Sequence, residues 1–424
     1  MSAYADIITV TNTSDSGPGS LRQALTNAND GDTIDFDASL KGQTISLTSS
    51  ELVINKSITI SGFGPNLLAV SRVPNATAFR IFDLMPGRAV TIQGLTISNG
   101  LAPDFGCGGG ILDQGSLLSL INCTVSGNST DGTGGGICVD ASATLTIDGS
   151  TLTGNYAGDY GGSIANGGTL IINNSTLNGN RGEFTGGAIL NGFNGDASLI
   201  LRNSTLSGNT TQLHGGGIFN GGQSAISNST LSGNSGMTAG AVLNRLGTLD
   251  IESTVLNRGE LGPNILNDSG TITSHGYNLS SDDGGNVLNG PGDQINTNPL
   301  LGPLQNNGGP TFTHQLLPGS PAIDAGDPNF TPPPFYDQRG PGFSRVVNGR
   351  IDKGSFEVQE GPTPTATATP SATATATATA TVTPTASPST TATPTSTPTL
   401  TPRPSPTQRP LVTPRPRPTP PHRL

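Results

Sequence analysis

The chain has 424 residues and a net charge of −10, with 60 glycines, no tryptophan and only 11% charged residues. The tail after Glu360 contains five arginines and no acid, so it contributes +5 and the remainder of the chain carries −15. This acidic body argues against a nucleic-acid groove, which needs clustered lysine and arginine. No apolar run is long enough to span a membrane, and the glycine-rich, charge-poor composition is typical of a repeat protein.

The first residues, Ala3-Tyr4-Ala5, match the A-x-A pattern of a signal-peptide cleavage site. We therefore expect an exported protein, extracellular or on the cell surface, with a signal peptide truncated at Ala5. A chance match at the start of a cytoplasmic chain is the alternative.

Residues 1–36 form the predicted N-terminal segment and cap. Ser20 is a suitable N-cap for a short helix. The apolar residues that follow it share one helical face: Leu21, Ala24, Leu25 and Ala28. Such a helix can cover the first exposed edge of a solenoid.

Residues 37–290 contain internal repeats. Two elements alternate: a strand-like string such as TLTIDGSTLTGN from Thr144, and a glycine string such as GGGI ending at Ile137. Six successive copies of the glycine string end 26, 27, 25, 29 and 24 residues apart. Inside each copy the apolar residues alternate with period two, as in Leu145 and Ile147, which predicts short β-strands.

Three short strands with turns fit one repeat of about 25 residues, and each lap rises by about one strand spacing of 4.8 Å. We therefore predict an all-β, right-handed parallel β-helix of about ten rungs. Glycines in the GGxI strings are expected where a side chain would clash with the turn.

One asparagine recurs at the same position of successive rungs. We expect these residues to form a structural ladder, because asparagine tolerates a left-handed backbone and can bond to its copy in the next rung: Asn128, Asn155, Asn180, Asn209 and Asn234.

Other recurring positions carry more than one interpretation. Asn174, Asn203 and Asn228 begin N-S-T strings that serve either as structural ladders or as glycan acceptors. Cys123 occupies the rung position that serines hold in later rungs, so its simplest role is a small ladder residue. With Cys107 and Cys138 it allows at most one internal disulfide, and the pairing stays open.

Beyond the repeats the rhythm breaks. Residues 291–360 are rich in proline and turns and are expected to form an irregular C-terminal cap that closes the last rung. Residues 361–424 form a Thr/Pro/Ala-rich tail that cannot bury a core, so we expect a disordered spacer.

Three blocks of sequence resemble a known family. These are TVTNTSDSGPGSLRQALTNANDGDTIDF, the rungs LTISNG…GGGI…NSTLSGN, and NTNPLLGPLQNNGGPTFTHQLLPGSPAIDAGD…DQRG…GRIDKGSFE. They are similar to bacterial right-handed β-helix proteins with a choice-of-anchor Q region, over about residues 7–358. The rungs also resemble, more distantly, the repeats of polymorphic outer-membrane proteins. The resemblance implies display outside the cell in adhesive or structural roles, and no known reaction.

Enzymatic hydrolysis of a polysaccharide requires a pair of carboxylates at the cleavage site. His275, Asp282 and Asp283 lie too close in sequence, and in the wrong order, for a polygalacturonase-like site. A lyase would need acids around Ca²⁺. Asp131 and Asp159 lie in equivalent loops that could hold Ca²⁺ weakly, whereas solvated loop acids are the simpler explanation, and His214 is expected to be a loop residue.

The sequence therefore favours a non-catalytic exported β-helix protein that binds a glycan or another surface. We expect no catalytic residue, no metal site and no cofactor other than weak Ca²⁺. The expected partner is a polysaccharide or cell-wall polymer, with no nucleic acid; the oligomeric state stays open. A polysaccharide lyase or glycoside hydrolase and a structural surface-layer component are the alternatives.

Overall fold

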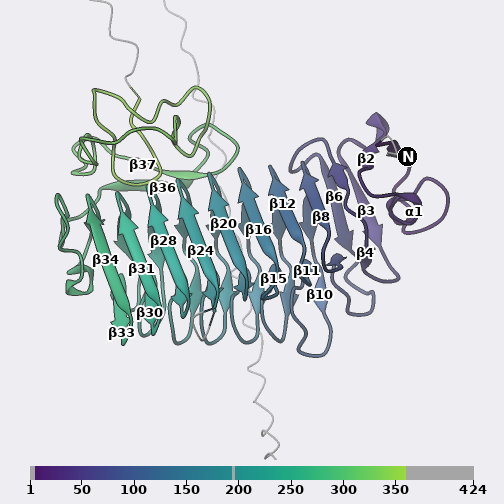
Figure 1. The fold of residues 1–424 in the computed structure, drawn as a ribbon, viewed down its shortest axis with the longest axis horizontal. Helices are drawn as coiled ribbons and strands as arrows, with labels where there is room; N and C mark the ends of the chain where they lie inside the picture. The colour runs from purple at the N-terminus through teal and green to yellow at the C-terminus, as the bar shows by residue number, and fades with distance from the viewer. Residues whose placement is uncertain (1–4, 193–195, 360–424) are drawn as a thin grey trace, which may run out of the picture. The chain divides into compact units, whose positions relative to one another are not determined.

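The computed structural model describes residues 5–192 and 196–359, and within them the chain forms a parallel β-helix. A typical turn passes in order through a first sheet, a second sheet, a short corner ladder and a third sheet, and each strand pairs in parallel with its copies one turn before and after (Figure 1). The three sheets contain nine to eleven strands each among the described residues, which confirms the predicted fold and its roughly ten rungs.

The first sheet contains β1 (Ile7–Val10), β2 (Thr33–Phe36), β5 (Thr59–Ser61), β8 (Ala89–Gln93), β12 (Leu117–Ile121), β16 (Thr144–Asp148), β20 (Thr169–Asn173), β24 (Ser198–Arg202), β28 (Gln223–Ser227), β31 (Thr248–Glu252) and β34 (Thr271–Gly276). The second sheet contains β3 (Gln43–Leu47), β6 (Leu68–Arg72), β9 (Thr96–Ser98), β13 (Thr124–Ser126), β17 (Thr151–Thr153), β21 (Thr176–Asn178), β25 (Thr205–Ser207), β29 (Thr230–Asn234), β32 (Val255–Arg258) and β35 (Leu279–Ser280).

The third sheet contains β4 (Leu52–Ile54), β7 (Phe82–Leu84), β11 (Ile111–Asp113), β15 (Ile137–Val139), β19 (Ile164–Asn166), β23 (Ile189–Asn191), β27 (Ile218–Asn220), β30 (Val242–Arg245) and β33 (Ile265–Asp268). The corner ladder, which the sequence reading missed, contains the two-residue strands β10 (Leu101–Ala102), β14 (Ser129–Thr130), β18 (Tyr156–Ala157), β22 (Arg181–Gly182) and β26 (Thr210–Thr211).

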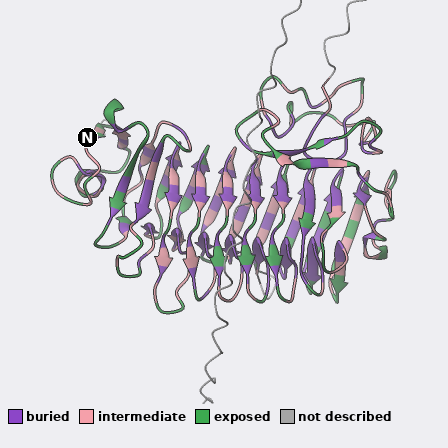
Figure 2. Ribbon diagram, turned by 180° about the vertical axis from the view of Figure 1, so that it is seen from behind, coloured by how far each residue is buried: buried purple, intermediate pink, exposed green. Residues whose placement is uncertain are grey.

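The core follows from the period-two pattern. Leu145, Ile147 and Leu152 are completely buried, whereas their strand neighbours are half-exposed. The registers place Leu145 directly between Leu118 and Leu170, so one apolar column continues from turn to turn. Figure 2 shows the resulting alternation of buried and exposed positions along the strands. Removing apolar surface from water stabilises a fold by about 25 cal/mol per Å², and the burial of these columns therefore drives the stacking of the turns.

The glycine strings allow the corner to close. Gly134 has φ +64°, a left-handed conformation that side chains rarely adopt. A Cβ at Gly135 would lie 2.2 Å from the carbonyl oxygen of Tyr156 in the next turn. The predicted role of these glycines in the turn is therefore confirmed.

The N-terminal cap is also confirmed. Helix α1 (Leu21–Asn27) begins after Ser20, whose Oγ accepts a hydrogen bond from the Gln23 N–H at 3.2 Å. Leu21 and Leu25 are buried against the first turns of the solenoid. The short 3₁₀ helix η1 (Ala38–Leu40) follows β2.

The opposite end of the core is closed by a segment that begins before residue 291, the predicted start of the cap. The 3₁₀ helix η2 (Gly284–Asn286) lies against β33, and Leu288 joins the central apolar core. Residues 291–297 continue this closure: Gln294 pairs in parallel with Leu279, and the Thr297 N–H donates to the Ser280 carbonyl oxygen.

Residues 298–358, the fold-back segment, extend the predicted C-terminal cap beyond the last rung. They include the antiparallel hairpin of β36 (Leu301–Gln305) and β37 (Thr313–Leu316). The segment runs back along the flank of the solenoid, over strands from β20 to β34 (Figure 1). At the last turns, Leu316, Ala322 and Phe356 pack with Val255 and Leu279. Lys353 Nζ donates there to the carbonyl oxygens of Asn278 and Gly292.

Threonines of the second sheet hold the fold-back segment. Thr176 Oγ1 donates to the Phe312 carbonyl oxygen at 2.6 Å, and Thr205 Oγ1 donates to Gln338 Oε1 at 2.6 Å. Both threonines are completely buried, whereas Thr151, their copy in an uncovered turn, is half-exposed. One flank of the middle and late turns is therefore internal, and a groove lies along the margin of the covering segment.

Candidate functional site

The three residues considered for catalysis do not form one site. His275 Nε2 lies 3.0 Å from Asp250 Oδ1 on the first sheet, and both side chains are about half exposed. Asp282 accepts hydrogen bonds from the Asn264 and Gly284 N–H groups, and Asp283 accepts one from Gly285. The pKa of Asp282 is lowered: burial raises it, but these backbone hydrogen bonds and that of Ser280 outweigh the burial. Asp282 and Asp283 thus stabilise turns at the C-terminal end of the core.

The loop candidates gather at the corner ladder. Asp131 and Asp159 lie in adjacent turns, where the Asp159 N–H donates to the Gly132 carbonyl oxygen. The pKa of Tyr156 is raised by burial and then by the charge of Glu183, with smaller contributions from Asp131 and Asp159. The weak Ca²⁺ site expected at Asp131 and Asp159 stays a prediction.

His214 belongs to the same row of loops. Its Nδ1 lies 2.7 Å from Thr238 Oγ1, and its pKa is lowered by burial and by the nearby Arg245. The ring pairs one loop with the next, which is a structural role.

The predicted asparagine ladder is present inside the solenoid. From Asn155 onward, each Oδ1 accepts hydrogen bonds from the backbone N–H and the Nδ2 of the asparagine one turn earlier, at 2.9–3.1 Å. The Oδ1 of Asn128, the first member, accepts from the Gly100 N–H. The left-handed backbone was expected at the asparagines themselves. In the structure the positive φ belongs to the glycines one residue earlier, such as Gly127 and Gly154.

A second internal ladder was missed by the sequence reading. Nδ2 of each member donates to Oδ1 of the next at 2.7–2.8 Å. The members occupy one register position of successive strands in the third sheet: Asn166, Asn191, Asn220, Asn244 and Asn267. The available signal was the asparagine that recurs two residues after the last four copies of the glycine string, at positions 166, 191, 220 and 244.

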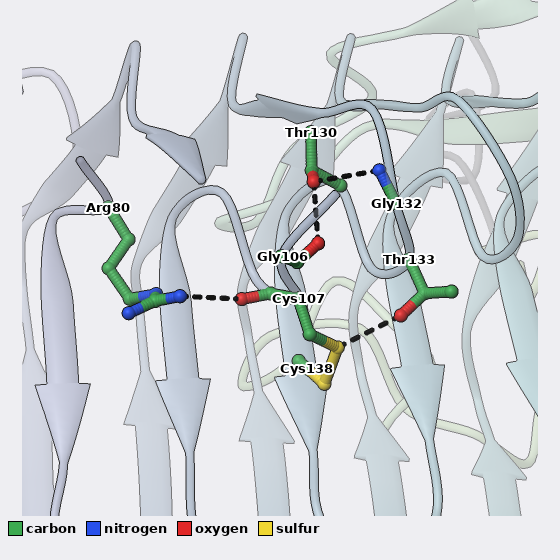
Figure 3. Close-up of a disulfide and its surroundings, with 7 residues drawn as sticks. All are labelled: Arg80, Gly106, Cys107, Thr130, Gly132, Thr133 and Cys138. Carbon is green, nitrogen blue, oxygen red and sulfur yellow. Dashed lines mark hydrogen bonds between the residues drawn. A yellow bond between two sulfur atoms is a disulfide. The ribbon is translucent and has the colours of Figure 1, made fainter. Parts of the chain in front are cut away.

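The cysteines are assigned by the structure. Cys107 and Cys138 form a disulfide that joins the loop before β11 to strand β15 of the next turn (Figure 3). Thr133 Oγ1 lies 3.0 Å from Cys107 Sγ, and Arg80 donates to the Cys107 carbonyl oxygen. Cys123 is a free, buried thiol whose N–H donates to Ser150 Oγ, so it continues the serine ladder as expected.

A groove of about 620 Å³ lies between the first sheet and the fold-back segment. Its floor contains the last residues of five successive strands: Asp148, Asn173, Arg202, Ser227 and Glu252. We call this row the groove column. Residues of the loop 327–334, including Phe330, form the facing wall. The sequence analysis did not recognise this column, because the side chains at this rung position differ from turn to turn.

Beside the groove column lies a row of asparagines with left-handed backbones, which are those of the N-S-T strings. Asn203 Nδ2 donates to Asn174 Oδ1, and Asn174 Nδ2 donates to Asp148 Oδ1, both at 2.7 Å. Asn228 Oδ1 accepts from the buried Arg345 at 2.9 Å. Since Asn203 and Asn228 are only 2% and 6% exposed, their engagement favours the structural interpretation over glycan acceptors.

Comparison with known proteins agrees with this architecture. Residues 82–235 match the family described as right handed beta helix region. The helix is right-handed. A solved structure, the crystal structure of pectate lyase Pel9A, is similar over 84% of this chain and 97% of its own, with 13% sequence identity and a TM-score of 0.47. At that level the similarity carries no inference about chemistry. No curated protein matches the chain.

One acidic cluster of the fold-back segment was not anticipated. Oxygens of Asp324, Asp352 and Glu357 lie within 4.8 Å of one another. Asp352 accepts from the N–H groups of Asp324 and Val358, and Glu357 accepts from the Asp352 N–H. Arg345 donates to the Asp352 carbonyl oxygen and supplies the neighbouring positive charge. The cluster is thus explained by hydrogen bonds that stabilise the segment internally.

Among the described residues, no helix is long and apolar enough to cross a membrane.

Proposed function

We propose that this protein is an exported, cell-surface β-helix that binds polysaccharide through the groove without cleaving it. The observation that carries the proposal is the groove column. Five side chains at one rung spacing present carboxylate, amide, guanidinium and hydroxyl groups, and Phe330 lies on the facing wall. Alternating hydroxyls and apolar ring faces of a glycan match such a surface, in which a few polar groups fix orientation beside apolar contacts.

Export is supported by three independent features. The disulfide between Cys107 and Cys138 is typical of an oxidising, extracytoplasmic compartment. Ala3-Tyr4-Ala5 matches a cleavage site, and the resemblance to choice-of-anchor Q proteins implies surface display. The tail, residues 361–424, lies outside the described residues; by composition it suits a spacer.

Absence of catalysis is supported by the positions of the candidate residues. His275 is paired with Asp250, while Asp282 and Asp283 are engaged in turns. The loop acids Asp131 and Asp159 lie at the corner ladder, which contributes no residue to the groove.

Affinity electrophoresis of the full chain in gels containing soluble polysaccharides tests the proposal. Reducing-sugar and unsaturated-product release are measured on the same panel, with and without Ca²⁺. We expect retarded migration without product release. Arg202→Ala and Phe330→Ala are expected to weaken retardation roughly tenfold each, since a hydrogen bond to a charged group or a buried aromatic contact contributes at least about 1.4 kcal/mol.

Phe335→Ala is the matched control, because Phe335 is 66% exposed on the same segment and is not among the residues that line the groove. Equal losses in Phe330→Ala and Phe335→Ala would place binding elsewhere. Product release above a heat-inactivated sample would replace the proposal by a lyase or hydrolase. Neither binding nor release would favour a structural surface-layer component.

A further inference from the structure

We infer that the groove selects a neutral, hydroxyl-rich glycan and excludes polyuronates. This inference rests on the proposed function, because it names the class of polysaccharide that the same groove accepts. It comes from the order of charges in the groove column and from the contacts that hold those charges in place.

The groove column has acids at both ends and a single base in its centre. The parallel register gives the order Asp148, Asn173, Arg202, Ser227, Glu252. With about 4.8 Å between turns, Arg202 lies roughly 10 Å from each terminal carboxylate. Asp327 on the facing wall adds a third carboxylate. Three negative charges therefore face one positive charge, on a body that carries −15.

The carboxylate of Asp148 is held in place. Its Oδ1 accepts from Asn174 Nδ2 at 2.7 Å, and Asn174 in turn accepts from Asn203 at 2.7 Å. Asn203 Nδ2 also donates to the Tyr336 carbonyl oxygen of the fold-back segment at 3.2 Å, which holds the Asn203 side chain in place. Because this chain of amides ends on the carboxylate, Asp148 cannot rotate away from an anionic ligand without losing a hydrogen bond.

The same row retains hydrogen-bonding capacity for an uncharged ligand. Asn203 is 2% exposed, lines the groove, and its Oδ1 has no hydrogen-bond partner among the described residues. Such an acceptor is satisfied by a hydroxyl donor directly or through water. Asn173 and Ser227, one turn on either side of Arg202, add neutral donors and acceptors.

A polyuronate places one carboxylate on every sugar. A chain that follows the groove column therefore brings like charges onto Asp148 and Glu252 whenever one uronate meets Arg202. Repulsion at such distances is felt most at low ionic strength, because the Debye length is about 8 Å at physiological salt and longer below it. A neutral chain meets no such repulsion and can accept and donate hydrogen bonds along the whole row.

The test uses affinity electrophoresis of the full chain in EDTA, which removes divalent bridges, at low and at physiological ionic strength. The probes are galactomannan and mixed-linkage β-glucan as neutral chains, and polygalacturonate and alginate as polyuronates. The wild type is expected to bind at least one neutral probe and neither polyuronate. Asp148→Asn/Glu252→Gln is expected to gain polyuronate binding of tenfold or more at low salt, because both terminal carboxylates of the groove column lose their charge.

The control is Asp250→Asn/Asp268→Asn. It also removes two negative charges, but from half-exposed positions outside the groove. Gain of polyuronate binding in the control as well would overturn the inference in favour of total charge. Polyuronate binding by the wild type that is lost in Arg202→Ala would also overturn it, while keeping the proposed function. If no probe binds at any ionic strength, the proposed function itself fails.

Discussion

Asn180 makes four side-chain hydrogen bonds although it is completely buried. It donates to Leu152 O and to Asn209 Oδ1, and it accepts from the N–H and the Nδ2 of Asn155. Each turn thus satisfies polar groups of the turns on both sides, and a buried polar network of this kind is costly to break. Single residues of the ladders therefore carry much of the stability.

Asn180→Ala is expected to lower the free energy of unfolding by about 2–4 kcal/mol, because several buried donors and acceptors lose their partners. Chemical denaturation followed by circular dichroism measures the shift. Asn178→Ala is the control, since Asn178 lies two residues earlier in β21 and is half-exposed. Similar shifts in both variants would contradict the ladder as a stabilising element.

Glu357 is buried in the fold-back segment, and burial raises its pKa to about 8. The folded protein therefore holds a proton that the unfolded chain loses near pH 4.5. This contribution to stability is fully present below about pH 4.5 and is lost as the pH rises towards about 8.

Glu357→Gln is expected to remove this contribution to the pH dependence, because glutamine stays neutral and its Oε1 can still accept from the Asp352 N–H. Denaturation midpoints of the wild type and the variant are compared from pH 5 to 8.5. The wild type should lose stability relative to the variant as the pH increases. A constant difference across this range would show that Glu357 titrates normally.

At the scale of elements, Gln338 joins the fold-back segment to the solenoid. Its Nε2 donates to Thr176 Oγ1 and Thr311 Oγ1 at 2.8 and 2.9 Å, and its Oε1 accepts from Thr205. Nearby, Arg339 is paired with Asp337 and lies 4.0 and 3.8 Å from the ring centroids of Phe343 and Phe356. The wall of the groove therefore depends on polar contacts at a buried seam.

Gln338→Ala is expected to loosen the fold-back segment while leaving the β-helix intact, at a cost of about 1–3 kcal/mol for the groups left unsatisfied. Hydrogen–deuterium exchange should increase in residues 298–358 and in β21 and β25, and remain unchanged in β8 and β12. Gln305→Ala, at an exposed position of β36, is the control. Increased exchange throughout the solenoid would contradict the idea that the segment is a separable cover.

At the scale of the whole solenoid, the two ends of the core are closed by different means. α1 buries Leu21 and Leu25 over the first turns, whereas η2 and Leu288 close the last ones. Stacked parallel strands offer unpaired edges at both ends, and such edges template association with other chains.

Leu21→Asp is expected to displace α1 and cause concentration-dependent self-association through the uncovered end. Light scattering and sedimentation measure the oligomer size. Thr26→Asp introduces the same charge on the exposed face of α1 and serves as the control. A monomeric Leu21→Asp variant with a native circular-dichroism spectrum would show that another segment protects this end.

The sequence by itself determined the rung period, the alternation of core residues, the internal asparagine ladder and the N-terminal cap. Each depends on neighbours in the chain or on identical positions one repeat away, so composition and spacing reveal them. Only the tertiary structure decided the disulfide pairing, the return of residues 298–358 along the flank, and the groove. Thr176 and Phe312 are 136 residues apart, and the segment that brings them together is irregular and rich in proline and glycine. No periodic pattern marks contacts of that kind, because they arise from the fit of one unique surface to another.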